Sequence, residues 1–545
     1  MPIHDQPHPG TGITVLDLPA DILYNIFDYF QDNRRYSKEG RYDNEGAENR
    51  QIIQNTRLVC HRFHKLVSSR LCPILQVRLD QASLDLITDI SKTPLVASGV
   101  RDVQVVLDYR PRELAQDLVR FKNLRKSELD RVCKSCAFLG ETWDTGDDDG
   151  DNDTVCLTPP SEYKKAMHYY QSICSAWDDY FSSADRNYKD AVSLQYQRIL
   201  HQGHADYRLK HEEQHRIITD GSFITTLASS ISRMSSFRSL HFITKIGHYI
   251  EPYILDPTHL LNNEEELNQF MSTPQDWQTI GELEGKAELS AAKILSELPI
   301  AIYKAGTLMR EININCSPPP HSYSMICPNR PNQFPPSWPD LTAACQHLQK
   351  IRFSETSYDT GCHPLLSEEQ AVIALYLGAI LSSKSIKDVS LEFSAFHSSN
   401  RSYSSAKASY HIGSVLSATK WPRIKRVCIR HVSLTQDELE TFFFSALGDS
   451  LESVYLDGIE LLSGSWAGAL DILREKVVSG CLDGKRTVGF LSLTGGQFGE
   501  EERRETSGFF SYDGDVKEPM IVRLAQNYVL GELAENPLRE GSRKA

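Results

Sequence analysis

The residues best suited to catalysis form the stretch HEEQH at residues 211–215. On a helix, His211 and His215 lie one turn apart, which is the spacing that binds zinc in H-E-x-x-H proteases, and Glu212 would serve as the general base. Such zinc-binding helices are largely buried, but the residues within and beside this stretch are charged or amide side chains. We therefore interpret it as a solvated helix face, with a zinc metalloprotease as the remote alternative.

Other short motifs lack the partners that their chemistry needs. Cys133 and Cys136 form a lone C-x-x-C pair, whereas a structural zinc site needs two further ligands at a suitable spacing. The stretch GELEGK at 281–286 is too short for a phosphate-binding loop, and the acidic residues near Gly150 do not align as a calcium-binding EF-hand. The sequence thus predicts no catalytic residue, no metal site and no cofactor.

The bulk composition is that of an ordinary globular protein. The chain has 545 residues, 40% of them hydrophobic, and a formal net charge of -14, which disfavours a protein that neutralises nucleic-acid phosphates. The longest apolar run, residues 371–381, is shorter than the roughly 20 residues needed to cross a bilayer, and the N-terminus does not resemble a secretory signal. We expect an intracellular protein of the cytoplasm, the nucleus or both, with reduced cysteines and no membrane or nucleic-acid partner.

Hydrophobic spacing divides the chain into four regions. A helical unit of small size is predicted at its start, because Leu23, Ile26 and Phe27 recur at helical spacing after Pro19, and a second apolar stripe follows near Phe63. The predicted regions are 13–75, a small all-α unit; 76–220, a helical linker region with a solvated, disordered acidic loop at 141–160; 221–500, an α/β repeat; and 501–545, a tail.

The α/β repeat rests on a recurring strand pattern. Each predicted strand has apolar residues at its first, fourth and sixth positions, and a helical stretch separates it from the next strand. Such alternation favours parallel strands stacked as an array. The apolar triplets are Phe237-Leu240-Phe242, Met309-Ile312-Ile314, Leu348-Ile351-Phe353, Ile386-Val389-Leu391, Ile424-Val427-Ile429, Leu451-Val454-Leu456 and Val488-Leu491-Leu493. A possible further strand is predicted at 100–107.

The first region resembles an F-box. The residues that carry the resemblance are LPADIL at 18–23, then Ile26-Phe27, and later RLVCHRF at 57–63, while the polar insert after Phe30 is longer than in a compact F-box. The repeat region resembles irregular leucine-rich repeats in pattern. The expected fold class is therefore mixed α and α/β, with an N-terminal all-α F-box, a helical spacer and a leucine-rich-repeat-like solenoid.

The resemblance implies a substrate-recognition subunit of a Skp–cullin–F-box ubiquitin ligase. Such a protein is not an enzyme; it binds a Skp-type adaptor, and through it a cullin scaffold, and holds an unknown protein substrate. The residues carried over to the adaptor contact are Leu18, Pro19, Ile22, Leu23, Ile26, Leu58, Val59 and Phe63. The alternative is a Skp-binding or scaffold repeat protein that acts outside the ligase.

Two further predictions concern substrate and regulation. Residues that alternate with the apolar triplets must line the opposite, concave face of the strands. These candidate substrate-binding residues are Asn313, Arg352, Glu392, Arg430, Tyr455 and Asp457. Separately, LTPPSE at 157–162 resembles a phosphodegron centred on Thr158, although Pro-Pro-Ser-Glu also suits the first turn of a helix.

Overall fold

The protein is a mixed α/β structure with one large parallel sheet, and we describe it from a computed structural model. The structure describes residues 15–30, 44–141, 160–181, 190–244, 257–283, 289–319, 321–328, 337–354, 365–394, 410–479, 486–491, 493–496 and 520–539. Most of the acidic segment 141–160, Thr158 and much of the tail lie outside these ranges. Within them, no helix is both long enough and apolar enough to cross a membrane.

The large sheet contains nine strands that follow one another in chain order. Every neighbouring pair is parallel, and each strand pairs with the next one without an offset in register, for example Ile312 with Ile351 and Ile351 with Val389. The strands are β1 (Ile74–Arg78), β2 (Asp102–Val106), β3 (Ser239–Ile243), β4 (Glu311–Asn315), β5 (Lys350–Phe353), β6 (Asp388–Glu392), β8 (Arg426–Arg430), β10 (Ser453–Asp457) and β12 (Thr487–Leu491).

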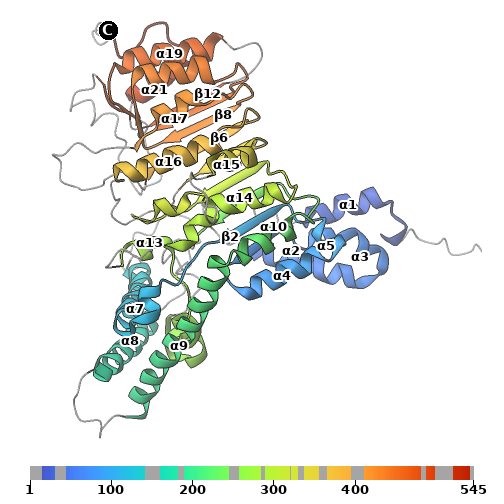
Figure 1. The fold of residues 1–545 in the computed structure, drawn as a ribbon, viewed down its shortest axis with the longest axis vertical. Coiled ribbons are helices and arrows are strands. Elements are labelled where there is room, and N and C mark those ends of the chain that lie inside the picture. The colour runs from blue at the N-terminus through green and yellow to red at the C-terminus, as the bar shows by residue number, and fades with distance from the viewer. Residues whose placement is uncertain are drawn as a thin grey trace, which may run out of the picture.

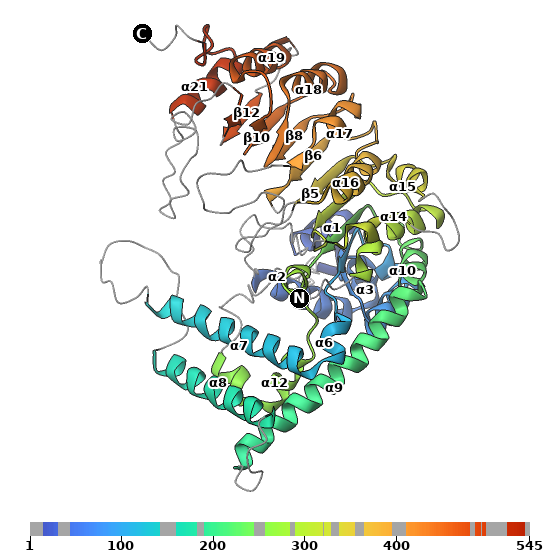
Figure 2. The same ribbon diagram turned by 60° about the vertical axis from the view of Figure 1, so that its left-hand side comes forward.

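Helices between successive strands cover one face of this sheet. In Figure 2 they lie along the outer side of the curved sheet, while the opposite face of β5 to β10 carries no helix of the described chain. The covering helices are α4 (Gln81–Ser91), α10 (Ser222–Ile231), α14 (Ile294–Lys304), α15 (Trp338–Cys345), α16 (Ser367–Ile380), α17 (Gly413–Ala418), α18 (Gln436–Thr441) and α19 (Trp466–Ser479).

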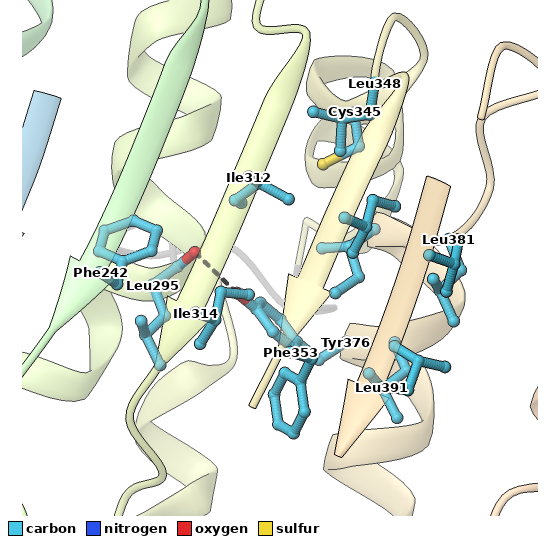
Figure 3. Packing of buried hydrophobic residues seen from close by; sticks show 14 of the residues in the cluster. Phe242, Leu295, Ile312, Ile314, Cys345, Leu348, Phe353, Tyr376, Leu381 and Leu391 are labelled. Carbon is cyan, nitrogen blue, oxygen red and sulfur yellow. Dashed lines mark hydrogen bonds between the residues drawn. The ribbon is translucent and has the colours of Figure 1, made fainter. Parts of the chain in front are cut away.

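Six of the seven apolar triplets point into the layer between sheet and helices. Ile312 and Ile314 on β4 pack beside Phe353 on β5 and Leu391 on β6, as Figure 3 shows. In the same view the hydroxyl of Tyr376 on α16 donates a hydrogen bond to the carbonyl oxygen of Leu295 on α14, at 3.2 Å. The core therefore joins neighbouring repeats through the sheet, and this hydrogen bond also links two helices that are two repeats apart.

A second, four-stranded parallel sheet continues the later repeats after a sharp turn. Its order is β13-β11-β9-β7, with β7 (Tyr410–His411), β9 (Val432–Leu434), β11 (Glu460–Leu461) and β13 (Thr494–Gly495). The turn places His431 after β8 and Gly458 after β10, both with a left-handed backbone, at φ 55° and 59°. This conformation costs glycine little, but it is uncommon for a histidine.

Three long helices form an arm beside the N-terminal strands: α7 (Leu118–Glu141), α8 (Pro160–Phe181) and α9 (Ala191–Thr219). In Figure 2 α7 and α8 project to one side, below the face of the sheet that carries no helix. The arm has its own apolar core, around Trp177 and Tyr207. This core also holds a buried ion pair in which Arg125 Nη1 lies 2.6 Å from Glu128 Oε2.

Shorter helices complete the described chain. Near the arm are α6 (Arg112–Gln116), α11 (Pro257–Asn262), α12 (Glu264–Met271) and α13 (Trp277–Gly281), and near the sheet are α5 (Pro94–Ala97), the 3-10 turns η4 (Ser290–Lys293) and η5 (Tyr323–Ile326), and the π-helix η7 (Phe442–Ala446). The N-terminal unit comprises η1 (Val15–Asp17), α1 (Ala20–Tyr29), α2 (Asn44–Val59), α3 (His61–Val67) and η2 (Ser68–Arg70), and it lies at one end of the sheet in Figure 1.

Six of the seven predicted strand triplets have the predicted register, and the last is wrong. Val488 pairs with Val454, and Phe490 pairs with Leu456, so Val488 occupies the fourth position and not the first. The polar residues Lys485, Arg486 and Thr487 precede Val488, so the first position of the true register carries no apolar residue. The array also begins earlier than the predicted boundary at 221, because β1 and β2 belong to the same sheet.

The predicted tail contains a packed helix. α21 (Met520–Val529) lies against α19 and β12, with Val522 and Val529 buried. Gln526 Nε2 donates to the carbonyl oxygen of Phe490 on β12, at 3.3 Å. A terminal strand leaves backbone groups and core side chains without a next repeat, and α21 covers part of that end.

We expect Tyr376→Phe to lower the free energy of unfolding by about 1 kcal/mol, because the buried carbonyl oxygen of Leu295 would lose the hydrogen bond that the Tyr376 hydroxyl donates. Urea unfolding followed by circular dichroism measures this change. Tyr303→Phe on the exposed side of α14 is the matched control and should leave the stability unchanged. Equal stability of Tyr376→Phe and the parent protein would contradict the role of this hydrogen bond.

Candidate functional site

The N-terminal unit has apolar side chains on two sides of one helix. On α1, Leu23 and Phe27 are buried in the core of the unit, whereas Ile22 and Ile26 are 42% and 41% exposed, and Tyr29 is 84% exposed. The spacing of four and three residues places the latter three on one stripe. The buried stripe packs in the unit, and the adjacent exposed stripe is available to a second partner.

A second helix of the unit also exposes apolar side chains. At the end of α2, Leu58 is 80% and Val59 is 68% exposed, although the neighbouring Phe63 is buried in the unit's core. The large hydrophobic side chains exposed in 15–59 are Val15, Leu16, Ile22, Tyr24, Ile26, Tyr29, Ile52, Leu58 and Val59. We call these nine residues the N-terminal apolar surface. Exposed apolar side chains concentrated in one small folded unit make it a candidate interaction site.

Polar bonds hold the backbone on which this surface rests. Cys60 adopts an extended conformation that ends α2, and its sulfur accepts a hydrogen bond from the Phe63 backbone N–H at the start of α3. Arg62 Nη2 on α3 donates to the Leu18 carbonyl oxygen at 2.6 Å, which fixes the Leu-Pro segment before α1. Arg70 pairs with Asp28 on α1, with 2.5 Å between Nη2 and Oδ1.

The eight predicted adaptor contacts separate into two groups. Pro19, Ile22, Ile26, Leu58 and Val59 are exposed. Leu23 and Phe63 are buried and Leu18 is half-buried, so these three side chains build the unit and cannot all face a partner as the sequence predicted. A family sequence pattern does not distinguish core residues from contact residues, because both kinds are apolar and recur at helical spacing.

The second candidate surface is the uncovered face of the large sheet. In-register pairing aligns its side chains in three rows across the strands. From β4 to β10 the first row is Glu311, Lys350, Asp388, Arg426, Ser453; the middle row is Asn313, Arg352, Ser390, Cys428, Tyr455; the last row is Asn315, Ser354, Glu392, Arg430, Asp457. We call this set the open face.

Ion pairs between neighbouring strands order the open face. Lys350 Nζ lies 3.5 Å from Glu311 Oε2, and Arg426 Nη2 lies 2.7 Å from Asp388 Oδ2. Arg352 in the middle row is exposed and has no hydrogen bond or ion pair to any described residue. Each of these groups is therefore presented by a strand whose inner face is anchored in the core.

One polar cluster at the end of β6 and β8 is held most tightly. Glu392 Oε1 lies 2.5 Å from His431 Nδ1, and Glu392 Oε2 lies 3.3 Å from Arg430 Nη1. The Arg430 guanidinium stacks over the Tyr455 ring, 5.0 Å from its centre. Tyr455 in turn leans over Gly489 on β12, where an added Cβ would lie 2.5 Å from the tyrosine ring.

Burial and charge oppose one another in this cluster. Burial disfavours the charged form of Glu392, but the hydrogen bond and charge of His431, with the charge of Arg430, outweigh it and hold the pKa of the carboxyl below its ordinary value. Burial would likewise lower the pKa of His431, yet the bond to Glu392 and the charges of Glu392 and Asp457 raise it. Burial raises the pKa of Asp457.

The six predicted substrate-binding residues all lie on the open face. Arg352, Glu392, Arg430 and Tyr455 are at least partly accessible, whereas Asn313 and Asp457 are buried, at 7% and 8% exposure. Their role in binding stays a prediction. Sequence reasoning missed His431, whose only signal was its position directly after a predicted strand, and it missed the first row entirely.

The HEEQH stretch is part of the packing between α9 and the sheet. His211 and Gln214 are buried, so the prediction of a solvated helix face is wrong for these two residues, although His215 is exposed. His211 Nδ1 lies 2.5 Å from the Arg110 carbonyl oxygen, and burial lowers the pKa of the ring. Gln214 bonds the backbone of Leu79, Asp108 and Arg110 after β1 and β2.

Metal-binding geometry is not found in the part of the chain that the structure describes: no three His, Cys, Asp or Glu side chains there are grouped to hold an ion. Cys133 is buried in the arm, and the side chain of Cys136 lies outside the described residues. Comparison with known proteins adds no family: no protein-family model matches this sequence, and no curated protein is significantly similar to it.

The Glu392–His431 pair predicts a pH-dependent stability. Since the pKa of Glu392 lies below 4.5 in the folded protein, its contribution is present above that pH and is lost as the pH falls further. Since the pKa of His431 lies above 6.5, its contribution is present below that pH and is lost as the pH rises through the folded value. The pair should stabilise most between these limits.

We expect Glu392→Gln to cost about 1–2 kcal/mol of unfolding free energy near pH 5.5 and clearly less near pH 8.5. Urea unfolding at both pH values measures the difference. Arg430 and Asp457 also face this pair, and both remain in the variant. Glu440→Gln, at an exposed carboxyl on α18, serves as control and should show no such dependence. A pH-independent cost would refute the proposed charge pairing.

His211→Ala should lower stability by about 1–3 kcal/mol, because it leaves the Arg110 carbonyl oxygen buried without its ring donor. Its exposed neighbour provides the control, and His215→Ala should change stability little. Elemental analysis of the purified protein should show no stoichiometric zinc. A zinc content near one per chain that disappears in His211→Ala would support the metalloprotease alternative instead.

Proposed function

We propose that this chain is the substrate-recognition subunit of a Skp–cullin–F-box ubiquitin ligase, acting in the cytoplasm, the nucleus or both. Its N-terminal unit is the F-box, and the N-terminal apolar surface docks on a Skp-type adaptor. The observation that carries this proposal is the outer stripe of α1, where Ile22, Ile26 and Tyr29 are exposed although the adjacent side of the same helix already fills the core.

The sheet would then be a leucine-rich-repeat-like solenoid that holds the substrate. This assignment is supported by the in-register parallel strands, by helices on a single face and by the left-handed turns after β8 and β10. The open face and the N-terminal apolar surface belong to different parts of the chain, so one molecule can bind adaptor and substrate together. No catalytic residue is required for this role.

The mechanism is positional. A receptor that holds a substrate beside a ubiquitin-loaded enzyme converts a bimolecular encounter into an intramolecular one, and it raises the effective concentration of substrate lysines. Geometry is then the main contribution of this chain. A short connection between the N-terminal unit and the sheet serves that role, and only three residues separate η2 from β1.

Adaptor binding tests the proposal. Ile22→Asp or Leu58→Asp should weaken binding to a purified Skp adaptor by at least about 100-fold, because each places a charge in an apolar contact. Both positions are exposed in the free chain, so the variants should remain folded by circular dichroism. Leu86→Asp, at a 55% exposed leucine on α4, is the matched control and should bind normally. Undiminished binding by both folded variants would exclude the F-box assignment.

Co-purification separates the ligase from a role outside it. With the adaptor bound, the parent protein should recover a cullin, and Ile22→Asp should lose adaptor and cullin together. Recovery of the adaptor without any cullin would favour a Skp-bound protein that acts outside the ligase.

A further inference from the structure

The open face has equal numbers of acids and bases at different depths. From β4 to β10 its acids are Glu311, Asp388, Glu392 and Asp457, and its bases are Lys350, Arg352, Arg426 and Arg430. In the Asp388–Arg426 pair the acid is 17% and the base 64% exposed, and in the Glu392–Arg430 pair the values are 13% and 43%. Only in the Glu311–Lys350 pair are the two side chains equally exposed, at 33% each.

Side-chain length explains this layering. Asp and Glu carboxylates lie close to the backbone, whereas the longer Lys and Arg side chains extend past them and keep their charged ends in water. A partner that approaches the open face therefore meets cations first. Arg352 strengthens the effect, since no described residue neutralises it. This cationic outer layer lies on a chain whose formal net charge is -14.

The shape of the open face favours an extended peptide segment as its partner over a flat protein surface. In the middle row the short side chains of Ser390 and Cys428 lie between Arg352 on one side and Tyr455 on the other. Arg426 and Arg430 flank Cys428 along β8. The result is a low floor with three arginines and one aromatic ring around it.

We propose that the open face binds an acidic segment of a partner protein, laid across β5 to β10 with its carboxylates beside Arg352, Arg426 and Arg430 and an apolar residue against Tyr455. The buried acids beneath would repel a uniform polyanion that penetrated to the floor, which favours a peptide with spaced charges over nucleic acid. This inference rests on the proposed function only in naming the segment as part of the substrate.

Direct binding to the full chain tests it. The probes are fluorescein-labelled peptides of identical alanine and leucine content that carry four glutamates, four glutamines or four lysines, with a fourth peptide that carries phosphoserines. The glutamate peptide should bind at least about tenfold more tightly than the glutamine peptide by fluorescence anisotropy, with an affinity that falls as salt rises. Comparison of the phosphoserine and glutamate peptides shows whether the open face prefers phosphate or carboxylate groups. Tighter binding of either peptide than of the glutamine peptide supports an acidic segment.

Three variants locate the site. Arg352→Gln, which breaks no described ion pair, should weaken the glutamate peptide by about fivefold, and Arg352→Gln with Arg426→Gln by about twentyfold. Asp388→Asn releases Arg426 from its partner and should tighten binding, an outcome that loss of folding cannot imitate. The charge-matched control is Arg233→Gln with Arg523→Gln, at exposed positions near α10 and on α21, and should bind like the parent.

The results distinguish this inference from the proposed function. Equal binding of the glutamate and glutamine peptides, or of the Arg352 variants and the control, would overturn the acidic-segment proposal. So would equally tight, salt-dependent binding of a single-stranded oligonucleotide, which would indicate a general polyanion surface. None of these outcomes affects adaptor binding, which depends on Ile22 and Leu58 and should persist in every open-face variant.

Discussion

In-register pairing of parallel strands is the constraint on which the other features depend. Side chains alternate across a strand, so a shift of one residue would turn Val389 and Leu391 from the core to solvent. Burial of the inner residues therefore fixes the register of every strand relative to its neighbours. The same register aligns the outer residues in rows. It places Glu392 directly beside Arg430, because the two residues are register partners on β6 and β8.

The positions of the polar groups on the open face are fixed by the apolar layer beneath the sheet. Charges on a mobile surface gain little from pairing because two side chains must be immobilised. Here the backbone beneath Asp388 and Arg426 is already fixed by Val389 and Val427, so part of that entropy is lost on folding and not on binding. A partner meets a charge pattern that is largely organised in advance.

Much of this arrangement could be predicted from the sequence, and the exceptions have physical causes. Alternation identified six strands and their outward residues, because β-strand periodicity depends on local sequence alone. It failed at β12, because the sequence has Lys485 at the first apolar position of the true register, while Val488, Leu491 and Leu493 match the same spacing out of register. It also failed at His211, since burial against Arg110 comes from a residue about a hundred positions away. At α1, periodicity identified the apolar residues but could not separate inward from outward ones.

The N-terminal unit is joined to the sheet by a short segment with close backbone contacts. η2 ends at Arg70 and β1 begins at Ile74, and Arg101 donates its backbone N–H to the Pro73 carbonyl oxygen between them. Beside this joint Gly99 lies so close to Ser69 that an added Cβ would lie 1.6 Å from the Ser69 carbonyl oxygen. A flexible linker would spread a bound substrate over a large volume, since effective concentration falls as linker length increases. The close backbone contact holds the N-terminal unit against the first strands of the sheet, and the proposed positional mechanism needs a connection of this kind.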